Sequence, residues 1–140
     1  MWVDARVVVG PSAIEGRGLV AGEDLAAGTL VVRLGGRLVT SAELADLIAR
    51  ADADPQAPYV DTVHVGGDTH LVLPPGTVAH FGNHSCEPSL RRSGAYDLVC
   101  GRAVAAGEEL TVDYATLSGP GFAMDCACGS PRCRGRVSTP

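Results

Sequence analysis

The sequence predicts a mostly-β domain of the α+β class, and two observations carry this prediction. Short apolar runs rich in β-branched residues recur along the chain, and glycines separate them. Such runs are typical of β-strands. Only one stretch combines a helical repeat of apolar residues with a start signal. Short strands with a single helix indicate an α+β domain without a second core.

The N-terminal half supplies the first strands and the helix. The runs ARVVVG (5–10) and GTLVVRLGGRLV (28–39) are predicted as strands. The stretch TSAELADLIARAD (40–52) is predicted as a helix, because Thr40 and Glu43 match a capping box. Leu44, Leu47 and Ile48 would then share one face of this helix.

The second half reads as further short strands. PYVDTVHVGGDTHLVLPPG (58–76) predicts two strands around a Gly-Gly turn. SLRRS, YDLVCGRAV and GEELTVDY predict three more, and Asp113 and Tyr114 would lie at the end of the last one.

Composition and charge exclude several classes of protein. The chain has 140 residues, enough for one domain, and 46% of them are hydrophobic. Its net charge of −5 disfavours direct nucleic-acid binding. We find no apolar run that predicts a membrane span and no signal peptide, so we expect a cytoplasmic protein if the source is bacterial, or a nuclear one if it is eukaryotic.

The negative charge is concentrated in residues 41–70, which hold six acidic residues against Arg50. This segment could attract a basic partner, or it could be an ordinary solvated helix face and loop. All eleven basic residues of the chain are arginine, so the chain contains no lysine.

The cysteines indicate a metal site. Cys126, Cys128 and Cys133 follow the spacing C-x-C-x4-C near the C-terminus, one ligand short of a tetrahedral zinc site. Cys100 lies in an apolar strand, whereas Cys86 lies in the polar turn FGNHSCEPSL, so Cys86 is the better fourth ligand. The alternative is a reactive or disulfide-forming cluster, which a cytosolic chain disfavours.

Four stretches carry a resemblance to a known family: EGRGLVA, NHSC, GEELTVDY and CACGSPRCRG, in this order. Together they resemble the SET domain of protein lysine methyltransferases with a post-SET zinc loop, without a pre-SET region. The resemblance implies small twisted β-sheets, a pseudoknot formed by the NHSC and DY segments, and a C-terminal zinc loop. It also implies a SET domain over residues 1–120 and a post-SET zinc-binding tail over 121–140.

The resemblance further implies an S-adenosylmethionine-dependent enzyme that methylates lysines of a basic, histone-like protein or peptide. Tyr114 would be the catalytic residue. The zinc ligands would be Cys86, Cys126, Cys128 and Cys133. The cofactor would be bound by Gly16, Arg17, Gly18, Tyr59, Asn83, His84 and Val137.

The chain departs from the family pattern at several positions. Leu34 stands where a tyrosine is common, Val112 where phenylalanine or tyrosine is common, Arg37 in place of glutamate and Ser89 in place of asparagine. These changes predict a wider lysine channel with fewer hydrogen bonds. They leave a second hypothesis open: a zinc-stabilised module, catalytically weak or inactive, that binds a basic protein segment.

Overall fold

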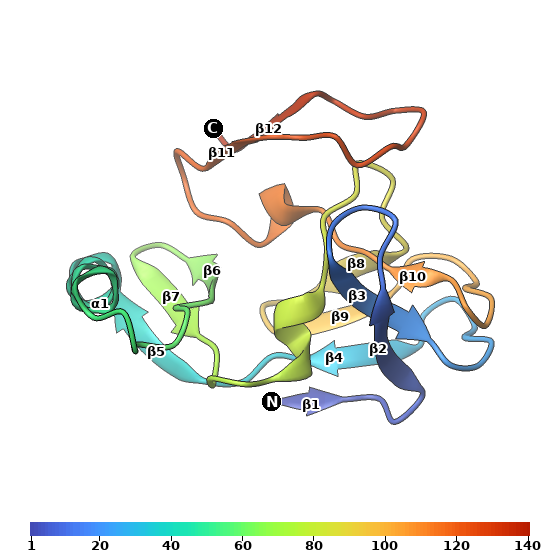
Figure 1. Cartoon of the computed structure of the whole chain (residues 1–140), viewed down its shortest axis with the longest axis horizontal. Helices are drawn as coiled ribbons and strands as arrows, with labels where there is room; N and C mark the ends of the chain where they lie inside the picture. The colour runs from blue at the N-terminus through green and yellow to red at the C-terminus, as the bar shows by residue number, and fades with distance from the viewer.

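The structure is a computed structural model that describes all 140 residues. Its strands form four separate small antiparallel sheets, joined by long loops (Figure 1). One α-helix and two short 3-10 helices complete the chain. The predicted mostly-β, α+β architecture of small sheets is therefore confirmed.

Two sheets supply most of the main core, to which the third sheet adds Val63 and Leu71. The four-stranded sheet has the order β1 (Trp2–Val3), β4 (Leu30–Arg33), β9 (Asp97–Cys100) and β8 (Leu90–Ser93). The three-stranded sheet has the order β10 (Glu109–Leu110), β3 (Arg17–Ala21) and β2 (Val7–Pro11). Their inward side chains are aliphatic, as expected for β-branched runs with one buried face. Leu90, Leu110, Val31 and Val32 of these sheets are fully removed from solvent. Leu25 and Val104, which pair in an isolated bridge outside the strands, are equally buried.

The third sheet and the helix form the part on the left of Figure 1. The sheet order is β5 (Arg37–Thr40), β7 (Thr69–Val72) and β6 (Thr62–Gly66). The turn of Gly67 and Asp68 joins β6 to β7, so Gly66 of the predicted Gly-Gly turn ends the strand. Helix α1 spans Ser41–Ala53 and begins with the predicted capping box of Thr40 and Glu43. It buries none of its residues, and even Ile48 on the predicted apolar face is 42% exposed.

Two segments far apart in the sequence meet at the centre of the molecule. After the 3-10 helix η1 (Val78–Phe81), the chain around His84 pairs in parallel with Val112. The backbone of Val112 donates to the carbonyl of Asn83 and accepts from the amide of Ser85, at 3.1 Å each. The NHSC and DY segments therefore lie side by side.

The predicted strand over GEELTVDY is wrong in its second half. Strand β10 ends at Leu110, and Tyr114 begins a 3-10 helix, η2 (Tyr114–Thr116). The carboxylate of Asp113 caps η2 by accepting from the amide of Ala115 at 3.0 Å. An Asp that accepts from the backbone in this way favours a turn over a strand.

The C-terminal residues form a two-stranded sheet of β11 (Ala123–Asp125) and β12 (Arg136–Ser138), which pairs Met124 with Val137. In Figure 1 this tail arches over the centre of the domain. The loop between its strands carries three cysteines. A boundary between two domains at residue 120 stays a prediction.

We find no helix in the structure whose length and hydrophobicity would let it cross a membrane.

Candidate active site and metal centre

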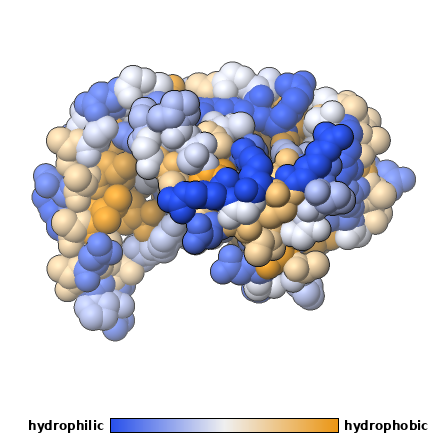
Figure 2. Space-filling model, turned by 90° about the horizontal axis from the view of Figure 1, so that it is seen from above, coloured by the Kyte–Doolittle hydropathy of each residue, from blue (hydrophilic) through white to orange (hydrophobic).

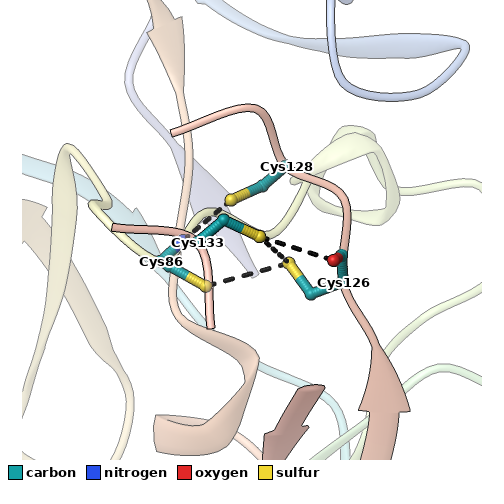
Figure 3. Close-up of side chains that lie close together, drawn as sticks. All are labelled: Cys86, Cys126, Cys128 and Cys133. Atoms are coloured by element: carbon teal, nitrogen blue, oxygen red, sulfur yellow. Dashed lines mark hydrogen bonds between the residues drawn. The ribbon is translucent and has the colours of Figure 1, made fainter. Parts of the chain in front are cut away.

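The four predicted cysteine ligands converge although forty residues separate Cys86 from Cys126. Their sulfurs all lie within 4.8 Å of one another, and Figure 3 shows them pointing toward a common centre. The sulfur of Cys126 is 3.8 Å from that of Cys86 and 3.7 Å from that of Cys133. Zinc with Zn–S bonds of about 2.3 Å separates its sulfurs by about 3.8 Å. The donor set therefore fits a tetrahedral zinc ion.

Cys100 lies outside this cluster. It is 1% exposed in strand β9, among aliphatic neighbours of the core. Burial raises the pKa of its thiol, which keeps the sulfur in the protonated form that binds metal poorly.

Arg134 joins the cysteine loop to the centre of the domain. Its backbone N–H and its Nε both lie 3.4 Å from the sulfur of Cys86. Its Nη2 donates to Asp113 Oδ1 at 2.7 Å, and this ion pair raises the pKa of Arg134. Since Asp113 immediately precedes Tyr114, the metal loop and the predicted catalytic tyrosine are held together by one side chain.

A smaller cavity of about 250 Å³ lies beside the cysteine loop. Asn83, His84 and Tyr114 line it from the core, and Met124, Cys126 and Cys128 line it from the tail. His84 is 4% exposed, and its Nδ1 accepts from the amide of Tyr114 at 3.1 Å. Burial lowers the pKa of His84, so its ring is held neutral as an acceptor.

The G-x-G turn borders this cavity through its neighbours Ile14 and Glu15. Gly16 has φ of +50°, a backbone conformation that favours glycine. Gly18 is buried, and a Cβ there would overlap the carboxylate of Glu109. The guanidinium of Arg17 lies over the ring of Phe81, 5.2 Å from the ring centre.

A larger cavity of about 640 Å³ lies on the other side of Tyr114, bordered by β6, η1 and the segment after η2. Leu34 and Val112 belong to its lining, so two of the four departures from the family pattern give it an aliphatic wall. Asp61 is its single carboxylate, and His80 Nδ1 lies 2.6 Å from Asp61 Oδ2. Figure 2 shows hydrophobic residues gathered in a recess on this side of the molecule, among hydrophilic ones.

Tyr114 lines both cavities. Its hydroxyl donates to the carbonyl of Gly82 at 2.8 Å, and its ring lies 5.3 Å from that of His84. Burial raises the pKa of Tyr114 to about 12, with a further contribution from the charge of Asp61. The hydroxyl therefore stays protonated at neutral pH and is a hydrogen-bond donor rather than a base.

Of the predicted cofactor residues, only Asn83 and His84 line the smaller cavity. The others do not line it: Gly16, Arg17, Gly18, Tyr59 and Val137. Tyr59 is 81% exposed and lines the larger cavity, apart from Asn83 and His84. Val137 is fully buried and pairs with Met124, which itself lines both cavities. Sequence reasoning missed Met124, because a methionine in a glycine-rich tail carries no signal of its own. It also missed Glu109, although the doubled acid in GEELT could have drawn attention to it.

The chain is similar in sequence to several proteins named histone-lysine N-methyltransferase. The chain is 33% identical over 139 residues to "Histone-lysine N-methyltransferase trithorax" of Drosophila virilis. This alignment covers 88% of this chain and 3% of that protein. It is 31% identical over 150 residues to "Histone-lysine N-methyltransferase ATX2" of Arabidopsis thaliana, in an alignment that covers 95% of this chain and 13% of that protein. It is 32% identical over 137 residues to "Histone-lysine N-methyltransferase ash1" of Drosophila melanogaster, in an alignment that covers 90% of this chain and 6% of that protein.

The chain thus spans only a small part of the length of these relatives, at most 13% among these three. The model of the SET domain matches residues 16–115, which include the glycine turn, the NHSC segment and Tyr114. This match covers most of the chain and confirms the resemblance derived from the sequence motifs. The chain belongs to the SET domain family.

Proposed function

We propose that this domain transfers a methyl group from S-adenosylmethionine to a lysine side chain of a basic protein. The observation that carries the proposal is the position of Tyr114 between two cavities of different character. A cofactor in the smaller cavity and a lysine side chain in the larger one would meet at its hydroxyl. The names of the relatives support lysine as the acceptor.

S-adenosylmethionine supplies an electrophilic methyl group on a sulfonium when it is bound. The residues of the chain bind and align. Asn83 and His84 line the smaller cavity, and Asn83 Oδ1 has no partner within the chain, so it can accept from a ligand. Cys86, Cys126, Cys128 and Cys133 would hold zinc, whose contribution is structural: it closes the tail over this cavity.

The attacking amine must be neutral. A free lysine has a pKa near 10.4, so losing its proton at pH 7 costs about 4–5 kcal/mol. The aliphatic wall of Leu34, Leu73 and Val112 disfavours the ammonium form and offsets part of this cost. The protonated hydroxyl of Tyr114 then orients the amine toward the methyl group, which is an alignment role.

Two features support a basic substrate. Asp61 is the one carboxylate in the larger cavity, and its Oδ1 accepts no hydrogen bond from the chain. Helix α1 borders this cavity through Leu44 and carries Glu43, Asp46 and Asp52 against Arg50. Both would attract the lysines and arginines of a histone-like peptide.

A methyl-transfer assay with labelled S-adenosylmethionine and a panel of basic proteins tests the proposal. Because the chain has no lysine, label on lysine can appear only on the added substrate. Transfer to lysine supports the enzyme. Binding of S-adenosylmethionine without transfer to any member of the panel would instead support a non-catalytic module that binds basic segments. Absence of S-adenosylmethionine binding, measured by calorimetry, would contradict the proposed enzyme.

We expect the rate of methyl transfer to rise between pH 7 and pH 9, up to tenfold per pH unit. The neutral fraction of the substrate amine rises by this factor below its pKa of about 10.4. Tyr114, with a pKa of about 12, does not titrate in this range and contributes no slope. Single-turnover rates at saturating substrates would check this, and a flat profile would contradict a rate set by the amine.

We expect Asp52→Lys to raise the KM for a basic peptide and to weaken its dependence on salt, with little change in kcat. The exposed charges of α1 act on association, and salt screens them over about 8 Å at physiological strength. Glu23→Lys is the matched control, since it makes the same change of charge in the exposed turn between β3 and β4, away from α1 (Figure 1). Equal effects of both variants would show that only the net charge matters.

A further inference from the structure

Glu109 lies behind the smaller cavity without lining it. The residue belongs to β10, which pairs with β3, the strand that begins in the glycine turn. Its carboxylate accepts from the hydroxyl of Ser12 at 2.8 and 2.9 Å and from Asn83 Nδ2 at 2.9 Å. One half-buried carboxylate thus joins the turn to the NHSC segment.

The contact with Ser12 shapes the turn. Because the Ser12 hydroxyl donates its hydrogen bond to Glu109, the lone pairs of its oxygen can accept from the amides of Ile14 at 2.9 Å and Glu15 at 3.2 Å. The amide of Ser12 closes the turn by donating to the carbonyl of Gly16 at 3.0 Å. Ile14 and Glu15 are the residues of this turn that line the smaller cavity. Glu109 therefore holds one wall of the cavity through Ser12.

The contact with Asn83 orients an amide. Four oxygens surround Asn83 Nδ2: those of Glu109, Ser12 and the carbonyls of Glu15 and Arg17, at 2.9 to 3.1 Å. A flipped amide would bring its own oxygen against all four. Glu109 is the only charged acceptor among them, and hydrogen bonds to a charged group are the stronger ones. The side chain of Asn83 is thereby held with Oδ1 away from the turn and free to accept.

We propose that Glu109 is a positioning residue of the cofactor site. It touches no ligand, and it holds both the Ser12–Gly16 turn and the Asn83 amide in the form that binds S-adenosylmethionine. The same contacts explain why Gly18 lacks a side chain, since a Cβ would occupy the place of the carboxylate. This inference rests on the proposed function, because it takes the smaller cavity as the cofactor site.

The test compares Glu109→Gln with Glu108→Gln. Both remove one negative charge, and Glu108 makes its contacts with Arg102 and the amide of Ala105, away from the cavity. Calorimetry measures the Kd for S-adenosylmethionine, thermal unfolding measures the Tm, and steady-state kinetics measure the KM for a basic peptide. We expect Glu109→Gln to weaken cofactor binding about tenfold or more with an unchanged peptide KM. Glu108→Gln should change the cofactor Kd and the peptide KM by less than about twofold each.

The double variant with Ser12→Ala tests the route of the effect. Because Ser12 and Glu109 would act as one unit, the double variant should bind the cofactor no more weakly than the weaker single variant. If Glu109→Gln does not fold, Ser12→Ala alone should show the same split between cofactor Kd and peptide KM.

Three outcomes would overturn the inference while leaving the proposed function standing: wild-type cofactor affinity in Glu109→Gln, a parallel rise of Kd and peptide KM, or additive losses in the double variant. A wild-type protein that does not bind S-adenosylmethionine would overturn both.

Discussion

Tyr114→Phe is expected to lower the rate of methyl transfer about 100-fold while changing the affinity for S-adenosylmethionine by less than about threefold. The substitution keeps the ring, which packs 5.3 Å from the ring of His84, and removes only the hydroxyl at the junction of the two cavities. An interaction that aligns the reacting groups matters most in the transition state, so its loss lowers kcat rather than binding. Single-turnover kinetics and calorimetry on the same protein would measure both quantities.

Tyr96→Phe is the matched control. Tyr96 is 39% exposed in the turn between β8 and β9, outside both cavities, so the same chemical change there should leave the rate unchanged. Near-normal turnover in Tyr114→Phe would show that Tyr114 is not the catalytic tyrosine. A loss of cofactor affinity as large as the loss of rate would assign the hydroxyl to binding instead.

Cys86→Ser is expected to reduce bound zinc from about one ion per chain to nearly none and to weaken cofactor binding strongly. Cys86 is the only ligand outside the tail, so its loss leaves three sulfurs on one loop and removes the link that the metal makes between the tail and the core. The tail wall of the smaller cavity, which includes Met124, Cys126 and Cys128, would then lose its anchor. Metal analysis by mass spectrometry and calorimetry with S-adenosylmethionine would check the two effects.

Cys100→Ser separates metal binding from general loss of stability. It removes a thiol from the core and should lower the free energy of unfolding while zinc content stays at one per chain. Zinc retained by Cys86→Ser, or lost only in Cys100→Ser, would exclude the proposed ligand set. Amide hydrogen exchange that becomes faster only in residues 121–140 when a chelator removes the metal would further show that the metal orders the tail.

Features governed by local chemistry were predictable from the sequence. The capping box at Thr40 and the hairpin of β6 and β7 follow from a few neighbouring residues and are confirmed. The choice of Cys86 over Cys100 depended only on polar and apolar neighbours, and the structure brings Cys86 to the tail cysteines. The apolar face of α1 was likewise predicted from neighbouring residues alone. The helix nevertheless lies at the edge of the molecule, and none of its residues is buried.

Features that depend on long-range packing were not predictable. The capping of η2 by Asp113 overrides the β-propensity of LTV, because Val112 is already paired with the NHSC segment. The contact of Glu109 with Ser12 crosses 97 positions of the sequence, and no periodicity signals it. The placement of Tyr59 on the larger cavity likewise depends on how the loop after α1 meets β6. The roles of the individual site residues stay predictions for the experiments above.

Met124 and Tyr114 are the residues common to the two cavities. A ligand bound in one cavity selects a rotamer of Met124, and a ligand entering the other cavity then meets the side chain in that rotamer. The two binding equilibria are therefore thermodynamically linked. Linkage is reciprocal: the factor by which S-adenosylmethionine changes the affinity for the peptide must equal the factor by which the peptide changes the affinity for S-adenosylmethionine. Met124→Ala, which shortens the shared side chain, should bring this factor toward one.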